Sequence, residues 1–443
     1  MTTTARATSP VRPSTRSKPS LPRLLAGVQP DAPLSLEEHF ARYGGVPWQG
    51  PPRRGMSPLI TMIDASGLRG RGGGAFPTGR KLRTVAAGRG RPVVVANGTE
   101  GEPASFKDKL LLAAVPHLVL DGAALAAEAI GADEVVVAID RCARASLRAT
   151  AHAIGTRQRA RLDPVPFRLV ETPSRYVAGE ESALVAFVDG KPAQPTAVPP
   201  RPYERGIGGR PTLVQNVETL AHIALVARYG PDWFRELGTE DEPGSTLVTV
   251  SGAVARPGVC EVRLGARLSD ALAGAGGPTC DLAAVLVGGY YGSWLPADAL
   301  DVPLTNAALR ARGAGLGCGV LYAFPAGHCG VAASARILHY LAGESAGQCG
   351  PCTFGLRAVA DTMQKIADGR HDANDLQRLD RWLNEIPGRG ACSYPDGVVR
   401  FAASALQVFG TEIARHGERG RCLSGDPPPM PLPDPRVAAG GWR

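Results

Sequence analysis

The hydrophobic pattern of this 443-residue chain changes twice from one end to the other, and these changes restrict the fold more than any single motif does. In the first part, three strand-like apolar runs (PVVVAN, EVVVAID and PFRLVE) alternate with helix-like segments at 107–114, 117–130 and 141–155. Alternation of this kind predicts an α/β domain with a mainly parallel sheet.

The second part of the pattern begins at Ser245, where two β-branched runs surround a turn rich in glycine and proline. A short helix at 268–275 and a strand at 283–287 follow, which favours a small β-grasp-like module. From Cys329 onward, apolar residues recur with the 3.6-residue period of amphipathic helices. The four helices predicted for this bundle cover 331–342, 353–367, 373–385 and 398–415.

These changes divide the chain into five segments. The first is a basic tail rich in Ser, Thr, Pro and Arg, which we expect to be disordered, and the last is a Pro-rich tail. The predicted boundaries are 1–33 for the basic tail, 34–243 for the α/β domain, 244–325 for the β-grasp module, 326–420 for the helical domain and 421–443 for the Pro-rich tail.

Charge and hydropathy exclude two classes of function. Five positive charges precede the first acidic residue, Asp31, and the net charge of about +3 that remains without them is too small for a nucleic-acid-binding surface. The longest apolar stretch, 110–132, is interrupted by His117, Asp121 and Glu128, so we expect no membrane insertion.

Nine irregularly spaced cysteines do not form a disulfide framework, which favours a reducing, cytoplasmic location.

The densest motif is SGLRGRGGGAFPTGRK at 66–81, which holds six glycines, three arginines and Lys81. Successive glycine amides can converge on an anion, and the basic side chains around them suit a phosphate. The motif is neither a Walker loop nor a Rossmann fingerprint, because IDASGL before it is a poor strand. A flexible surface loop explains the same glycines equally well.

Three further segments carry candidate polar groups. Asn97 to Glu102 leave a predicted strand, at the sheet edge where open α/β sheets bind ligands, although a solvated charged turn is the alternative. Glu180 and Glu181 precede a short apolar helix, where acids can also simply complement the helix dipole. Asn216 opens another helix, where an amide can cap the helix or bind the edge of a heterocycle.

Together, the motifs GLRGRGG-FPTG-K, N--EGEP-SFKD, GEE-AL and NVETLA resemble, in order and spacing, the NADH-oxidising flavoprotein subunit of respiratory complex I. The same family includes the matching subunits of NAD-linked hydrogenases and formate dehydrogenases. The resemblance covers about residues 40 to 420. It implies an FMN-binding α/β domain that is not a Rossmann domain, an SLBB-like β-grasp module, and a four-helix-type bundle that holds a 4Fe–4S cluster.

The resemblance also implies an activity. Hydride would pass from NADH or NADPH to FMN, and single electrons would leave through the cluster to a protein or quinone-linked acceptor. The expected partner is a ferredoxin-like or other iron–sulfur subunit. The implied cofactor-binding residues are Gly70, Arg71, Gly72 and Lys81 at the FMN phosphate, Asn97 and Glu100 near the isoalloxazine, Gly179, Glu180, Glu181, Asn216 and Thr219 at further flavin contacts, and Phe76, Glu102 and Glu181 near the nicotinamide nucleotide.

The chain departs from the family at the cluster motif. The family's ESCGxCxPC reads ESAGQCGPC here, so Ala346 takes the first ligand position, while Cys349, Cys352 and Cys392 match the other three. Three thiolates can hold a 4Fe–4S cluster with a different fourth ligand, or a three-iron cluster. Zinc or a free dithiol are the alternatives. The other candidates for the fourth ligand are Cys329 and Cys318.

The nucleotide site departs as well. Thr84 and Arg201 stand where the family places rings against the NADH adenine, and Val198 replaces a nearby lysine. Arg201 could stack by its guanidinium plane or pair with a 2′-phosphate and so select NADPH, and Tyr203 could supply a ring. The flavin-side change is Thr99 in place of a family Asp.

These departures keep two alternatives to an NAD(P)H-oxidising flavoprotein open. One is a ferredoxin-linked flavoprotein that binds no dinucleotide. The other is a non-catalytic scaffold or ligand-binding module that retains the fold and lacks the redox groups.

Overall fold

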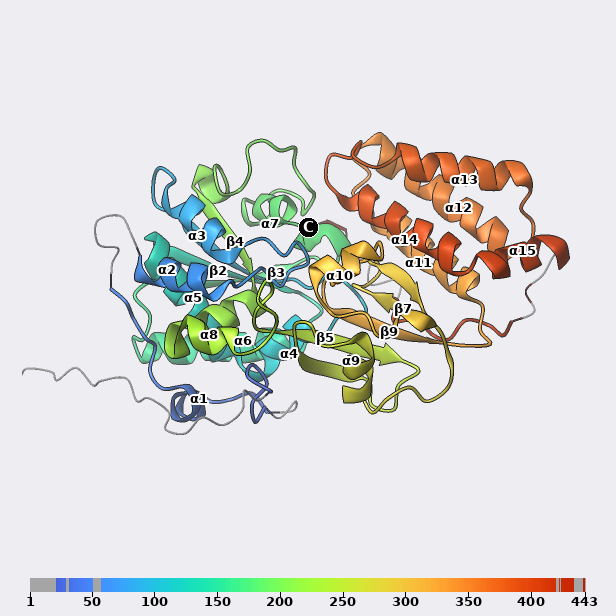
Figure 1. Ribbon diagram of the computed structural model, residues 1–443. Helices are drawn as coiled ribbons and strands as arrows, with labels where there is room; N and C mark the ends of the chain where they lie inside the picture. The colour runs from blue at the N-terminus through green and yellow to red at the C-terminus, as the bar shows by residue number, and fades with distance from the viewer. Residues whose placement is uncertain are drawn as a thin grey trace, which may run out of the picture.

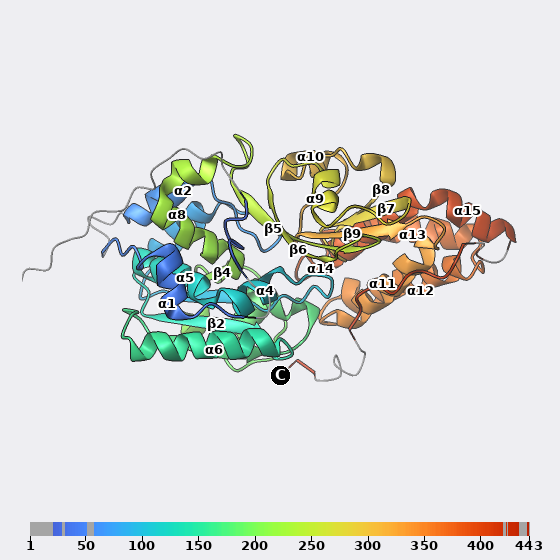
Figure 2. The ribbon, with the colours of Figure 1, turned by 90° about the horizontal axis from the view of Figure 1, so that it is seen from below.

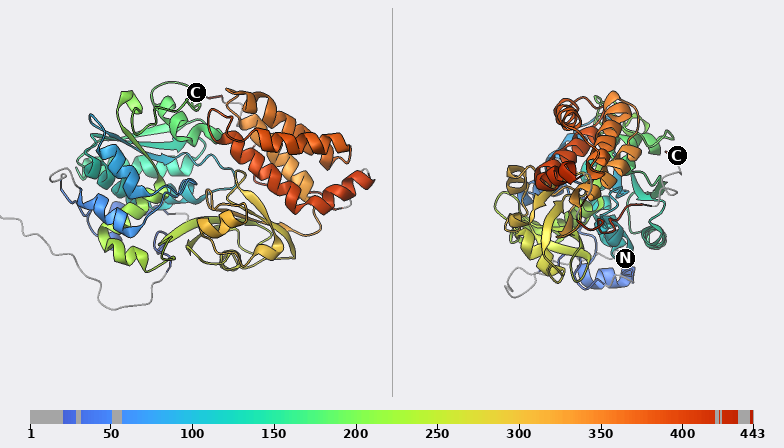
Figure 3. Two further views of the ribbon diagram at one scale, coloured as in Figure 1. Left: turned by 45° about the horizontal axis from the view of Figure 1, so that its top comes forward. Right: turned by 90° about the vertical axis from the view of Figure 1, so that its right-hand side faces the viewer.

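The computed structural model describes residues 21–28, 32–50, 57–419, 422, 424–433 and 441–442. Figure 1 shows an α/β domain in blue to green, a smaller β-rich module in yellow and a helical bundle in orange to red. Both later parts lie on one side of the α/β domain, as the left view of Figure 3 also shows.

The α/β domain is built on four parallel strands in the order β3-β2-β1-β4. The prediction of a mainly parallel sheet is therefore confirmed. Asn97 at the end of β1 lies directly opposite Asn216 at the end of β4. The strands are β1 (Val93–Gly98), β2 (Glu134–Asp140), β3 (Phe167–Thr172) and β4 (Thr212–Asn216).

Both faces of the sheet are buried at the central strands β1 and β2, which explains why these two strands are apolar runs and do not alternate with polar residues. Val94 and Ala96 belong to the large core under α5 and α8, whereas Val93 and Val95 face a smaller core with Leu184 of α7. In Figure 1, α7 lies above the sheet, and Figure 2 shows the other face. The helices are α1 (Leu36–Tyr43), α2 (Pro58–Ser66), α3 (Thr78–Ala86), α4 (Lys107–Ala114), α5 (Pro116–Ile130), α6 (Arg144–Arg159), α7 (Glu181–Val188) and α8 (Val217–Arg235).

The β-rich module is a five-stranded mixed sheet in the order β6-β5-β9-β7-β8. Among the described strand pairs of this second sheet, only β5 and β9 run parallel to each other. Helix α9 packs on this sheet. Its elements are β5 (Ser245–Gly252), β6 (Gly258–Arg263), α9 (Leu268–Gly274), β7 (Leu282–Val287), β8 (Ser293–Pro296), α10 (Asn306–Ala311) and β9 (Val320–Pro325).

The helical bundle differs from the prediction at its last helix. The single helix expected over 398–415 is two helices, which meet at Phe409 and Gly410. The ring of Phe409 is buried against Trp294 and Phe324, and glycine at the next position is a poor helix former, so the chain turns there. The described bundle helices are α11 (Gly330–Glu344), α12 (Leu356–Ala367), α13 (Ala373–Glu385), α14 (Tyr394–Val408) and α15 (Gly410–Arg419).

The predicted basic tail, 1–33, falls largely outside the described residues, but 21–28 differ from a disordered tail. Leu24 is fully buried, and the backbone amides of Arg23 and Leu24 donate to Glu261 of β6. The Arg23 guanidinium lies 3.8 Å from the ring centroid of Trp233 in α8. This short segment therefore joins the α/β domain to the β-rich module.

Among the described helices, no single one is long and apolar enough to cross a membrane. Helices α4 and α5 reach this length together, with a bend of 96° between them.

Candidate functional site

The candidate site lies at the carboxyl edge of the parallel sheet, where β1 and β4 end side by side. The Asn97 side chain donates to the carbonyl of Gly179 (2.8 Å). Asn216 caps α8 by accepting the amide of Glu218, and its Nδ2 donates to Asp108 (2.7 Å). Three segments that are far apart in sequence thus meet at one edge, as expected for parallel strands in an open sheet.

The glycine-rich segment packs onto this edge. The Gly70 amide donates to the Phe76 carbonyl, so residues 70–76 form a closed loop. The backbone amide of Arg71 donates to Thr219 Oγ1 (2.8 Å). A Cβ atom at Gly72 would lie 3.2 Å from the Cβ of Asn216, so a larger residue here would move the two segments apart by a few tenths of an ångström.

Two of the predicted phosphate-loop side chains have different surroundings. The Arg71 guanidinium points into the core, donates to the Ser245 carbonyl and lies 3.9 Å from Glu218, so its side chain faces β5. Lys81 is partly exposed, and its Nζ lies 2.5 Å from Glu181. Of the two cations, Lys81 is therefore the one placed to meet a bound anion.

Two predicted carboxylates are engaged as helix caps. Glu180 accepts the amides of Ser182 and Ala183 at the start of α7. Glu100 has a left-handed backbone (φ +41°), and its carboxylate accepts the amides of Asp108 and Lys109 at the start of α4. Their side chains therefore hold the two loops in place, and a flavin contact from either residue stays a prediction.

The edge of the sheet also offers polar atoms without a partner. Among the described residues, Thr78 Oγ1, Thr99 Oγ1 and Gln215 Nε2 are buried and make no hydrogen bond. Buried polar groups are seldom left unpaired, so these atoms fit a site completed by a bound polar molecule. They come from the glycine-rich segment, the loop after β1 and the end of β4, which are the three segments expected to hold FMN.

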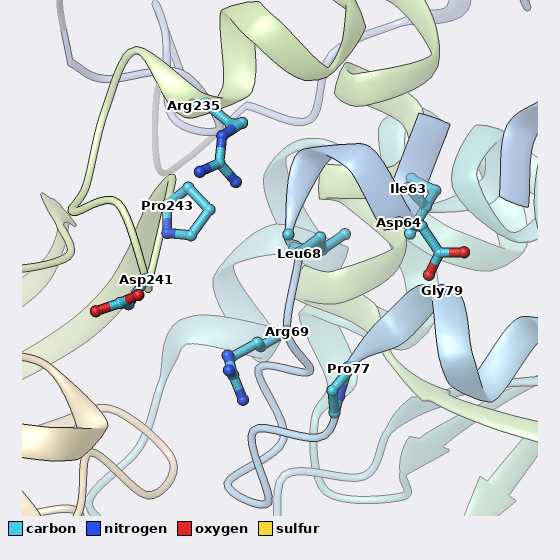
Figure 4. Close-up of a pocket in the computed structure, with 10 residues that line it drawn as sticks. Ile63, Asp64, Leu68, Arg69, Pro77, Gly79, Arg235, Asp241 and Pro243 are labelled. Carbon is cyan, nitrogen blue, oxygen red and sulfur yellow. The ribbon is translucent and has the colours of Figure 1, made fainter. Parts of the chain in front are cut away.

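A separate depression lies on the outer side of the glycine-rich segment (Figure 4), between Arg69 and the loop around Asp241 and Pro243. Its volume of about 130 Å³ is below the 300–1,000 Å³ typical of small-molecule sites. None of its lining residues belongs to the predicted flavin contacts. We therefore assign no cofactor to it.

Lys107 lies beneath the site and is 2% exposed. Its Nζ lies 2.8 Å from both Asp108 and Glu218. Burial alone would raise the pKa of Glu218, but Lys107 and His222 lower it to about 2. Lys107 therefore neutralises buried carboxylates and is not available as a phosphate ligand.

Glu102 is the most unusual carboxyl group of the site. It is 6% exposed, and its Oε2 accepts hydrogen bonds from Tyr176 Oη (2.8 Å) and the Tyr290 amide (2.9 Å). A Cβ atom at Gly289 would lie 2.6 Å from this oxygen. Burial raises the pKa of Glu102 to about 7, although these hydrogen bonds oppose the rise. A carboxyl group with this pKa can hold or release a proton near neutral pH.

The three predicted cluster cysteines lie together at the end of the bundle that faces α7. Burial, then Cys349 and then Cys392 raise the pKa of the Cys352 thiol to about 12, so the three thiols lie close enough to interact electrostatically. Cys352 lies in a short π-helical turn, Pro351–Gly355, which comes directly before α12. Ala346 offers only its carbonyl, which accepts a hydrogen bond from Gln194. Three thiol ligands are thus present for an iron–sulfur cluster.

The two other candidates for the fourth ligand lie elsewhere. Cys329 caps the start of α11, whose 15 residues separate it from Ala346 by about 22 Å at 1.5 Å per residue. Cys318 donates to the carbonyl of Gly288 and lies beside Glu102. The suggestion that Cys329 completes the cluster is therefore wrong, because a whole helix intervenes.

Comparisons with known proteins agree with this layout. Family models match residues 63–225 (Nuo51 FMN-binding domain), 247–289 (SLBB domain) and 332–416 (NADH-ubiquinone oxidoreductase-F iron-sulfur binding region). An NADH-quinone oxidoreductase F subunit of Rhizobium meliloti is 33% identical over 82% of this chain and 90% of its own. The NADH-quinone oxidoreductase F subunit of Streptomyces coelicolor is 35% identical over 81% of this chain and 82% of its own.

This chain belongs to the family of NADH-quinone oxidoreductase F subunits. It is also similar to the NADP-reducing hydrogenase subunit HndC of Solidesulfovibrio fructosivorans, which is 29% identical over 88% of this chain and 82% of its own. A solved structure of an NAD⁺-reducing [NiFe]-hydrogenase in the H₂-reduced state superposes with a TM-score of 0.74 and 34% identity. That match covers 81% of this chain and 62% of the hydrogenase chain.

Membership of this F-subunit family confirms several predictions. The chain has an FMN-binding domain, an SLBB domain and a 4Fe–4S-binding region in the predicted order, and it is a member of an oxidoreductase flavoprotein family whose relatives are subunits of larger complexes. No finding tests the predicted site residues one by one or the domain boundaries, which stay predictions.

Two residues that differ from the F-subunit family at the expected nucleotide site, Thr84 and Arg201, lie on the surface. Thr84 is exposed, and its hydroxyl donates to the carbonyl of Arg80 within α3. Arg201 is also exposed. Tyr203 packs partly buried against the large core, so it supplies no free ring in this structure. Phe76, in contrast, is 48% exposed at the tip of the glycine-rich loop.

Two tyrosines of the site were missed by sequence reasoning. Tyr176 and Tyr290 both bind Glu102, but they lie 74 and 188 residues away from it along the chain. No local motif relates either of them to Glu102. Glu102 and Tyr176 meet within the α/β domain, and the packing of the β-rich module on that domain adds Tyr290.

Proposed function

We propose that this chain oxidises NADH or NADPH at an FMN bound on the carboxyl edge of the sheet and passes the electrons to an iron–sulfur cluster held by Cys349, Cys352 and Cys392. FMN supplies the conversion of a two-electron hydride into single electrons. The protein contributes position, charge and the exclusion of water around these groups.

One observation carries the proposal: the segment Arg175–Glu181 borders both redox sites. Glu181 pairs with Lys81 of the glycine-rich segment on one side. On the other side, Glu180 lies close enough to Cys392 to contribute to its raised pKa, after burial. The rings of Tyr176 and Tyr394 lie 5.6 Å apart between the two sites. The flavin segments and the cysteines are thus adjacent, as electron transfer between them requires.

The polar groups of the site divide into distinct roles. Lys81 would pair with the FMN phosphate, and the backbone around Gly70 and Gly72 would allow the phosphate to approach closely. Asn97 and Asn216 would face the flavin ring system from adjacent strand ends. Glu102 would hold a proton beside the nicotinamide near neutral pH, and the exposed ring of Phe76 would contact the nucleotide.

We also propose a partner and a location. Relatives named as subunits of a quinone oxidoreductase and of a hydrogenase support a partner subunit that docks near the cysteines and receives single electrons. We expect this partner to be an iron–sulfur or ferredoxin-like subunit. All nine cysteines are free, which fits a reducing cytoplasm.

The test of the FMN assignment is Lys81→Ala. Hydrogen bonds to charged groups contribute about 1.5–3 kcal/mol, so this variant should retain FMN about ten- to a hundredfold more weakly than wild type. FMN released from purified protein during dialysis is quantified by fluorescence. Lys191→Ala removes an exposed lysine outside the site and should retain FMN normally. Equal FMN retention in the two variants would contradict the phosphate assignment.

A further inference from the structure

A second group of metal-binding side chains lies in the helical bundle, away from the cluster cysteines. Cys329, Glu412, His416 and Cys422 each offer one ligand atom, and these four atoms all lie within 4.8 Å of one another. Cys329 and His416 are buried, and the other two are partly buried. In Figure 1 this group belongs to the end of the bundle marked by α15, on the right.

The four residues come from three segments of the chain. Cys329 is the N-cap of α11. Glu412 and His416 lie one turn apart on the same face of α15. Cys422 belongs to the segment that follows α15. A metal ion at this point would therefore connect the first and last helices of the bundle to the C-terminal segment.

The histidine is oriented as a metal ligand. His416 is 1% exposed, and its Nδ1 lies 3.0 Å from the carbonyl of Ile366, so Nδ1 carries the proton and donates. Its Nε2 then presents a lone pair toward Cys329 Sγ, 3.7 Å away, and toward Glu412 Oε1, also 3.7 Å away. Metal-bound histidines are commonly held by a hydrogen bond of this kind from the other ring nitrogen.

The ligand spacing fits a tetrahedral ion. Zinc bonds of about 2.3 Å to sulfur and about 2.0 Å to nitrogen or oxygen place tetrahedral ligand atoms about 3.3–3.8 Å apart. The separations of 3.7 Å from His416 Nε2 to Cys329 Sγ and to Glu412 Oε1 are a few tenths of an ångström longer than the ideal nitrogen–sulfur and nitrogen–oxygen spacings of about 3.5 and about 3.3 Å, so small side-chain shifts would close the site on an ion. The Ala332 amide also donates to Cys329 Sγ (3.2 Å), and such a bond stabilises a thiolate.

We propose that Cys329, Glu412, His416 and Cys422 bind one structural zinc ion. Two thiolates, one imidazole and one carboxylate form a closed four-ligand set that leaves no position for a substrate. The 15-residue helix α11 separates this ion from the iron–sulfur cysteines. The proposal does not depend on the redox function of the protein.

The ion would fix the C-terminal segment against the bundle. Beyond Cys422, Gly425 exchanges backbone hydrogen bonds with Gly327 and Cys329. Further along, the carbonyl of Pro431 accepts a hydrogen bond from Tyr290, whose amide binds Glu102. The zinc site therefore anchors one end of a segment that reaches the Glu102 site at its other end.

The test is the metal content of the full-length protein, measured by elemental analysis. Wild type should contain about one zinc per chain, and Cys422→Ser and His416→Ala should each lose most of it while retaining iron and FMN. Cys280→Ser changes an exposed cysteine and should retain zinc. Cys349→Ser should lose iron and retain zinc, which separates the two metal sites.

A second measurement, made on the wild-type protein, tests the proposal even where the variants fail to fold. Wild-type protein stripped of zinc and loaded with Co²⁺ should show the intense thiolate charge-transfer and visible bands of a tetrahedral cobalt–sulfur site. Zinc retained in both ligand variants would overturn the proposal, and so would a wild-type protein that neither contains zinc nor binds Zn²⁺ or Co²⁺. Loss of iron in place of zinc from Cys422→Ser would overturn the assignment of the metal.

Discussion

Replacing Lys107 with methionine is expected to lower the free energy of unfolding by about 3–5 kcal/mol. Methionine fills a similar volume but leaves Asp108 and Glu218 without their shared cation, and both carboxylates are almost fully buried. The lowered pKa of Glu218 gives this interaction a pH dependence. Its stabilising contribution is present above about pH 4.5 and is lost as the pH falls toward about 2.

Urea denaturation at pH 7, followed by circular dichroism, measures this effect. Lys365→Met is the matched control, because Lys365 pairs with Asp375 from a half-exposed position and such pairs contribute at most about 1 kcal/mol. The double variant Lys107→Met/Glu218→Gln should recover part of the lost free energy of unfolding, because it removes one of the two uncompensated charges. A loss below about 1 kcal/mol in Lys107→Met would show that the buried charges are compensated in another way.

The second large effect is expected on the iron content of variants in which a cluster cysteine is replaced. Cys349→Ser and Cys392→Ser should each lose most of the bound iron, because a cluster that begins with three thiolates would be left with two. Ala346→Cys should have the opposite effect. It restores a fourth thiol at the position where the F-subunit family has one, so more iron should survive exposure to air.

Iron and acid-labile sulfide are quantified in anaerobically purified protein before and after exposure to air. Cys142→Ser, which changes an exposed cysteine of the α/β domain, serves as the control and should match wild type. Unchanged iron in both serine variants would leave these cysteines without a role in the cluster.

The part of the site that depends on strand order could be predicted from the sequence. Apolar runs that alternate with helices give parallel strands, so Asn97 and Asn216, each at the end of its run, reach the same edge. The sequence also predicted that no strand precedes the glycine-rich segment, because IDASGL lacks the hydrophobic pattern of a strand. In the structure that stretch is the end of α2 and the turn after it.

Other features depend on tertiary packing, which a single sequence does not show. Arg71 looks like a phosphate ligand among glycines, yet its side chain turns to the Ser245 carbonyl, which is 174 residues away. The break at Phe409 follows from the docking of its ring on Trp294 in another domain. Cys329 was one of two candidates for the fourth ligand, and the helix predicted at 331–342, which separates it from Ala346, already argued against it.

The most direct test of the central claim is one anaerobic absorption spectrum of the purified protein, repeated after adding NADH and then NADPH. We expect a flavin envelope with a broad iron–sulfur shoulder, bleached by at least one of the two nucleotides. Flavin and cluster absorption that neither nucleotide bleaches would contradict the nucleotide-oxidising function and leave a protein electron donor to be found. A protein that stays colourless after reconstitution with FMN, iron and sulfide would contradict the redox function altogether.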